Sequence, residues 1–194
     1  MGRQSGLRLN ARFSWSRLRP NLQLMSFIAP YLTAQRWPLL AAVLSALILG
    51  GAYVFEYGFG YAPCPLCLDQ RYIHMAAIAA GLIGFLALRL EAVKPFAMWV
   101  CLIIGAIFLY SAGFAGWHAG IEYGWWEGPA SCSTAGPLSI SADDLFAVMD
   151  GTATGVVPCG VAAWTLFGIS MAGYNALMSF GLAMISFYLG VFRK

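Results

Sequence analysis

The sequence predicts an all-α membrane protein: a bundle of four transmembrane helices with two outer loops and a short interfacial helix in the second loop. Hydrophobic residues make up 60% of the 194 residues and charged residues only 10%, which is outside the usual range of soluble domains. Long stretches carry no charge, and the positive charges fall in alternate connections. We expect a protein that works within lipid and has no nucleic-acid partner.

Four apolar stretches define the predicted spans. They are Leu39 to Phe55, Tyr72 to Leu88, Pro95 to Trp117, and a segment within Val161 to Phe192. A spanning helix needs about 20 predominantly apolar residues, so the flanks of the first two stretches must contribute. The fourth stretch is long enough to tilt or to extend past one interface. Helices are expected because backbone polar groups in lipid must be satisfied internally.

The positive charges predict the orientation of the bundle. Ten of the eleven lysines and arginines precede the first span, lie between the second and third spans, or end the chain. The positive-inside rule makes this side cytoplasmic, so both termini of a multi-pass protein are expected there. Arg71 is the exception, because it lies at the outer end of the second span. A lone cation in that position is costly unless something uses it.

The chain divides into a tail, residues 1–36, and a membrane domain, residues 37–192. The tail is rich in arginine and contains no acidic residue. We interpret it as a basic cytoplasmic segment that lies on anionic lipid. In the alternative interpretation, translation starts at Met25.

Cys64 and Cys67 form a C-x-x-C pair beside prolines in the first outer loop. Such pairs are typical of redox centres or metal sites. Asp69 is the predicted N-cap of the second helix, which leaves Cys67 just outside a helix N-terminus, where partial positive charge favours a thiolate. If the helix begins earlier, Cys67 and Arg71 lie four residues apart on one face.

Cys132 and Cys159 form a second pair in the second outer loop. They are too far apart for the close-spaced ligand pairs typical of zinc, so we predict no metal. One interpretation is a structural disulfide that closes the loop. The other is a bond made and broken at each turnover, in an electron relay with the first pair. Between the two cysteines, Ser141 to Met149 begins like a capping box and predicts the interfacial helix.

Other polar or reactive residues lie within the spans. Cys101 is interpreted as a small buried apolar residue without a role, and Asn175 as the donor or acceptor of an interhelical hydrogen bond. His74 and His118 lie near the outer ends of their helices. They are interpreted either as interfacial histidines or as a pair of haem ligands.

These residues together carry a resemblance to a known family. The segments concerned are Cys64-Pro-Leu-Cys67-Leu-Asp-Gln-Arg71, Trp117-His118-Ala-Gly-Ile-Glu122, Pro158-Cys159 and Trp164 to Asn175. They resemble the disulfide bond formation protein B (DsbB) family over about Trp37 to Phe192. The order and spacing of all four loop cysteines are those of the family.

The resemblance implies a four-helix thiol oxidase of the bacterial inner membrane, with both loops in the periplasm. Cys132 and Cys159 would accept electrons from a periplasmic thioredoxin-fold oxidase (DsbA-like), with Cys132 forming the mixed disulfide. Cys64 and Cys67 would receive these electrons and pass them to ubiquinone or menaquinone from the membrane pool. Arg71 and His118 would belong to the quinone site.

A second hypothesis comes from another class of protein. The chain would be a non-enzymatic membrane subunit that anchors a quinone or haem and contains only structural disulfides. A structural disulfide has a very low reduction potential, whereas a relay disulfide is labile. Redox titration therefore distinguishes the two hypotheses.

Overall fold

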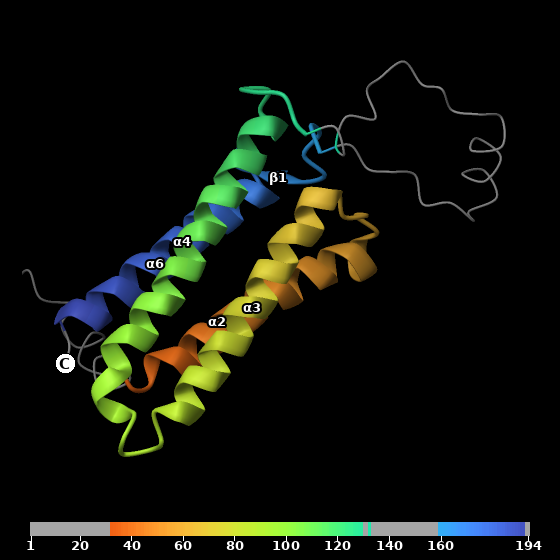
Figure 1. Cartoon of the computed structure of the whole chain (residues 1–194). Helices are drawn as coiled ribbons and strands as arrows, with labels where there is room; N and C mark the ends of the chain where they lie inside the picture. The colour runs from red at the N-terminus through yellow and green to blue at the C-terminus, as the bar shows by residue number, and fades with distance from the viewer. Residues whose placement is uncertain (1–31, 130–131, 133–158, 193–194) are drawn as a thin grey trace, which may run out of the picture. The chain divides into compact units, whose positions relative to one another are not determined.

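Four long helices make up most of the chain for which the structure is described (Figure 1). The computed structural model describes residues 32–129, 132 and 159–192, which all fall within the unit Thr33–Lys194 apart from Leu32. The helices are α2 (Trp37–Tyr53), α3 (Pro65–Ala87), α4 (Ala97–Glu122) and α6 (Met171–Phe192). The tail up to residue 31 and the predicted interfacial helix at Ser141 to Met149 lie outside the described residues.

Within the described residues, three stretches of helix are long and apolar enough to cross a membrane: Trp37–Gly58, Lys94–Glu122 and Met171–Phe192. A mostly helical membrane protein, as the sequence predicts, is therefore confirmed at this level. The helix α3 has 23 residues, but its first turns carry polar and charged side chains that lower its apolar character. Its crossing of the membrane stays a prediction.

Two element boundaries differ from those that the sequence predicts. The helix α3 begins at Pro65 with Cys64 as its N-cap, so the assignment of Asp69 as the N-cap was wrong. Proline is favoured in the first helical turn, because it has no N–H to leave unpaired there. In the fourth apolar stretch, a hairpin of β1 (Thr165–Leu166) and β2 (Ile169–Ser170) precedes α6.

The helices associate in two antiparallel pairs, α2 with α3 and α4 with α6 (Figure 1). Small residues allow the first pair to approach closely. A Cβ added at Gly81 of α3 would lie 2.6 Å from the carbonyl oxygen of Pro38 and 2.9 Å from the Cβ of Ala42. Hydroxyl groups form further hydrogen bonds to α6. The Oγ atoms of Ser111 in α4 and Ser179 in α6 are 3.0 Å apart, and the indole N–H of Trp37 in α2 donates to the Oγ of Ser186 in α6.

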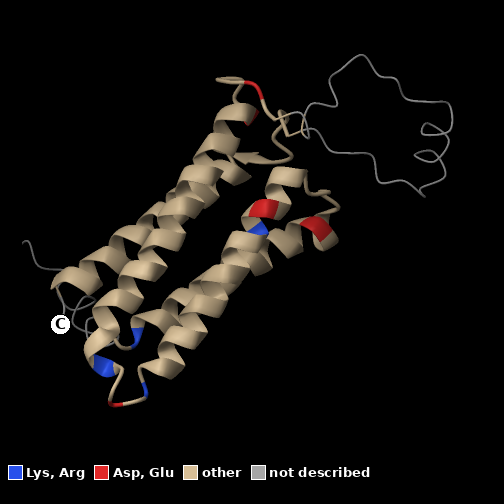
Figure 2. Cartoon of the chain, viewed as in Figure 1, with Lys and Arg blue, Asp and Glu red and all other residues tan. Residues whose placement is uncertain are grey.

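Charged residues gather at the two ends of the helices, and the lengths between them are almost uncharged (Figure 2). One end contains the start of α2 and the loop between α3 and α4, with Arg36, Arg89 and Lys94. The other end contains Arg71 and most of the acidic side chains of the described segments. This distribution is the one that the charge pattern of the sequence predicts.

The contact at Gly81 generates a prediction about stability. Replacement of Gly81 by Ala should lower the free energy of unfolding by about 1–3 kcal/mol, because backbone rather than a flexible side chain occupies the space of the new methyl group. The control is Gly113→Ala in α4, where a Cβ meets no atom within 4 Å. Thermal unfolding in detergent measures both. Equal midpoints for the two variants would contradict the close packing of α2 on α3.

Candidate functional site

Cys64 and Cys67 lie at the N-terminus of α3, where the backbone shapes their surroundings. The Sγ of Cys64 accepts the backbone N–H of Cys67 at 3.3 Å, so a sulfur caps the helix. The two sulfurs are 2.8 Å apart and are not bonded to each other. The C-x-x-C pair is therefore present as a dithiol with one sulfur at the positive end of a helix.

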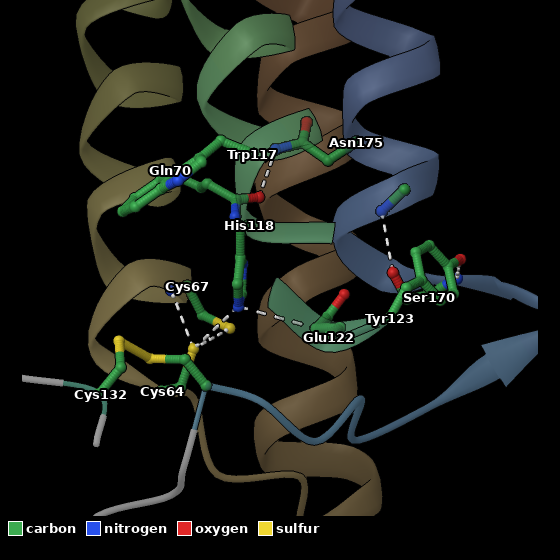
Figure 3. Close-up of polar contacts among 12 residues, drawn as sticks. Cys64, Cys67, Gln70, Trp117, His118, Glu122, Tyr123, Cys132, Ser170 and Asn175 are labelled. Atoms are coloured by element: carbon green, nitrogen blue, oxygen red, sulfur yellow. Dashed lines mark hydrogen bonds and ion pairs between the residues drawn. A yellow bond between two sulfur atoms is a disulfide. The ribbon is translucent and has the colours of Figure 1, made fainter. Parts of the chain in front are cut away.

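The second cysteine pair is a disulfide that packs directly on the first pair. Cys132 and Cys159 are bonded to each other and buried, in one cluster with Cys64, Leu66 and Ile121. The Sγ atoms of Cys64 and Cys159 lie within 4.8 Å of each other. The structure thus brings together all four cysteines that the sequence singled out, from two loops that are far apart in the chain (Figure 3).

His118 lies beside Cys64, and its hydrogen bonds define which nitrogen carries the proton. Its Nε2 is 3.5 Å from the Sγ of Cys64, and its Nδ1 is 2.7 Å from the amide nitrogen of Gln70. The orientation of that amide is set by Asn175, whose nitrogen donates to the Gln70 oxygen at 2.7 Å. Since Gln70 donates to Nδ1, a neutral His118 carries its proton on Nε2 and presents it toward Cys64.

These contacts stabilise the thiolate of Cys64. The hydrogen bond from the Cys67 thiol has the largest effect and, with a smaller contribution from His118, lowers the pKa of Cys64 to about 5. The ordinary value for a cysteine is about 8.5. Thiol–disulfide exchange requires a thiolate, and Cys64 meets this condition at neutral pH with a disulfide next to it.

The hydrogen-bond chain continues from Gln70 into the bundle. The oxygen of Asn175 lies 2.8 Å from the Nε2 of His74, and the Nδ1 of His74 lies 2.8 Å from the hydroxyl of Ser45. The interhelical hydrogen bond predicted for Asn175 is therefore present. Both rings use both nitrogens within the protein, which argues against the alternative in which His74 and His118 ligate haem.

Arg71 is buried, and its guanidinium is held by α2 and the turn that follows it. It forms an ion pair with Glu56 and lies over the ring of Tyr53, 4.8 Å from the centroid. Glu56 is part of the π-helical turn Val54–Gly58, an irregularity that is often found at functional sites. No pattern in the sequence indicated this pairing, because Glu56 and Arg71 are in different helices and the π-turn has no pattern of its own.

A cavity of about 790 Å³ opens beside the dithiol. Its walls are largely apolar side chains of α2 and α6. Its polar end is formed by Cys64, Cys67, Gln70, Arg71, His74, Glu122 and Asn175. Volume and lining are those of a site for a small apolar ligand with a few polar groups.

Two residues of α4 have different neighbours: one contacts the sulfurs and the other lines the cavity. Glu122 lines the cavity, whereas His118 contacts Cys64 and is absent from the described lining. No pattern in the sequence indicated a role for Glu122, because a single acidic residue at the end of an apolar stretch has no pattern of its own. Cys101 lies elsewhere, within α4, where its thiol donates to the carbonyl oxygen of Ala34.

Comparison with known proteins identifies the family. The model of the family described as "Disulfide bond formation protein DsbB" matches residues 34–189. The chain belongs to the DsbB family. It is therefore a membrane protein of disulfide-bond formation, and its buried cysteine cluster lies in the part that matches the DsbB family.

Several relatives match over most of their own length. Disulfide bond formation protein B 2 of Pseudomonas savastanoi pv. phaseolicola is 30% identical over 77% of this chain and 83% of its own. Disulfide bond formation protein B of Methylococcus capsulatus is 28% identical over 76% and 88%. An uncharacterised protein of Rickettsia prowazekii is 28% identical over 81% and 92%. No solved structure matches this DsbB-family chain.

The surroundings of Cys64 generate a prediction about its titration. In reduced protein that keeps only Cys64 and Cys67, thiolate absorbance in the ultraviolet should rise as pH increases through about 5. Cys67→Ala should move this midpoint furthest toward the ordinary value of about 8.5, because the Cys67 thiol gives the largest stabilisation. His118→Phe should move it less. An unchanged midpoint in both variants would refute the assigned contacts.

Proposed function

We propose that this chain is a thiol:quinone oxidoreductase of the bacterial inner membrane. It reoxidises a periplasmic thioredoxin-fold oxidase (DsbA-like) and passes the electrons through Cys132–Cys159 and Cys64–Cys67 to ubiquinone or menaquinone. One observation carries the proposal: a disulfide packs on a dithiol, and that dithiol opens on an apolar cavity. A purely structural disulfide, as in a non-enzymatic anchor, would need neither an adjacent dithiol nor an adjacent cavity.

The thiol steps balance as two exchanges. A thiolate of the partner attacks Cys132, and the second partner thiol resolves the mixed disulfide, which leaves Cys132 and Cys159 reduced. Cys159 then attacks the Cys64 sulfur of an oxidised Cys64–Cys67 pair, and closure of Cys132–Cys159 moves the dithiol to the first pair. The Cys64–Cys159 approach of under 4.8 Å supports this route.

The residues around the cavity fit a quinone. When bound there, a quinone accepts two electrons and two protons from the dithiol. The apolar side chains of α2 and α6 would surround its tail, and Arg71 would donate from the polar end to a ring oxygen. Glu56 and Tyr53 hold the guanidinium in one orientation, so the donor is positioned before the ligand arrives.

The proposed orientation follows from the charges and the cysteines. Lysines and arginines are concentrated at the end opposite the cysteine cluster, which the positive-inside rule assigns to the cytoplasm. The cysteines then face the periplasm, an oxidising compartment in which disulfides persist. Both termini are cytoplasmic in this arrangement.

Reconstitution tests the function directly. Protein in liposomes with ubiquinone or menaquinone should reduce the quinone when a reduced thioredoxin-fold donor is added, and should form one quinol per donor disulfide. Cys67→Ala should abolish turnover. Cys159→Ala should accumulate a mixed disulfide between Cys132 and the donor, because the resolving thiol is missing. Cys101→Ala is the matched control and should behave as wild type. A wild-type protein that reduces no quinone would refute the proposal.

The role of Arg71 is tested by a change that keeps its charge. Arg71→Lys should raise the KM for quinone at least tenfold, or about 1.4 kcal/mol of binding, because lysine lacks the planar fork of donors. Exchange between the donor and Cys132–Cys159 should be unchanged. Arg89→Lys, at the opposite end of α3, is the control. A wild-type KM in the Arg71 variant would leave Arg71 as a structural anchor.

A further inference from the structure

Glu122 has a buried carboxyl group that takes no part in the thiol–disulfide exchanges described above. Its side chain is only 6% exposed, and it lines the cavity beside the dithiol. Its Oε2 has no hydrogen-bond partner among the described residues, and no lysine or arginine of that part forms an ion pair with it. An ionised carboxylate is costly to bury unless its oxygens are satisfied. This geometry suits a group that carries a proton for part of the reaction.

The imidazole of His118 lies between this carboxyl and the sulfurs. The Nε2 of His118 lies 3.5 Å from the Sγ of Cys64 and 3.9 Å from the Oε1 of Glu122. Gln70 occupies Nδ1, so His118 offers a single N–H to both acceptors. That N–H can strongly stabilise only one anion at a time. A proton on Glu122 rather than on Cys64 therefore puts the negative charge at one acceptor of His118 and not at the other (Figure 3).

We propose that Glu122 holds the proton that Cys64, as a thiolate, does not carry once the dithiol has formed, and donates it to a ring oxygen of the quinone when the dithiol is oxidised. This inference rests on the proposed function. His118 is then a positioning residue, which donates to the Cys64 thiolate in that state. Glu122 is a catalytic residue, because it lies on the cavity wall.

The step balances in electrons and protons. Formation of the Cys64–Cys67 disulfide releases two electrons and two protons, which end on the quinone as a quinol. The thiols of Cys132 and Cys159 supply these two protons in the exchange that forms the dithiol. Glu122 holds one of them, because Cys64 leaves that exchange as a thiolate. The other comes from the Cys67 thiol, whose sulfur also lines the cavity. The carboxylate that remains on Glu122 is ready to accept a proton when the dithiol forms again.

The first test needs no quinone. Infrared difference spectra, reduced minus oxidised, are recorded on protein in which Cys132 and Cys159 are replaced by Ala, so that only the first pair changes. A protonated carboxyl band should appear on reduction. It should be absent in Glu122→Gln and in Cys64→Ala, and retained in Glu91→Gln, the control at the exposed ion pair with Lys94. A band that survives Glu122→Gln, or no band at all, would overturn the proposal.

The second test measures turnover of the full enzyme. Glu122→Gln keeps the shape of the side chain but cannot give up a proton. It should lower kcat for quinone reduction about 100-fold, the usual contribution of a general acid. The KM for quinone and the exchange with the thiol donor should stay within twofold of wild type. A raised KM with unchanged kcat would instead make Glu122 a binding residue and refute the proton role.

The two tests also separate this inference from the function on which it rests. If wild-type protein fails to reduce quinone, the proposed function is wrong. If wild type turns over and Glu122→Gln does so equally well, the function stands and the role of Glu122 is refuted.

Discussion

A single chain of buried hydrogen bonds determines how the four helices are oriented. It runs from Ser45 of α2 through His74 and Gln70 of α3, with Asn175 of α6 between them, to His118 of α4. Apolar helix surfaces in lipid can rotate against each other at little cost, whereas a polar group without a partner is expensive there. Each link therefore fixes the rotation of one helix about its own axis.

The same chain determines the chemistry at its outer end. Asn175 orients the amide of Gln70, and that amide leaves His118 with its proton on the nitrogen beside Cys64. Removal of an internal link would allow the amide to turn and the ring to change its tautomer, although no internal link touches a sulfur. Packing deep in the bundle and reactivity at the cysteine pair thus depend on one set of contacts.

The sequence predicted the parts of this protein that repeat a pattern or carry a strong motif. Uninterrupted apolar stretches predicted the helices, and the resemblance to the DsbB family implied that the two cysteine pairs meet. It did not predict that Cys64 caps α3, nor that Glu56 holds Arg71, because each depends on a local backbone choice with several alternatives of similar energy. The role of Gln70 was missed for another reason: a hydrogen-bond chain becomes visible only when the rotation of every helix is known.

The last turn of α4 explains how electrons and protons can take different routes over a short distance. His118 and Glu122 are four residues apart, so they lie one above the other on the same face of the helix. On that face His118 contacts the sulfur cluster and Glu122 lines the cavity. Electrons need only pass between sulfurs, whereas a proton needs an acceptor on the cavity side. A helix that ended one turn earlier would keep the sulfur contact and lose that acceptor.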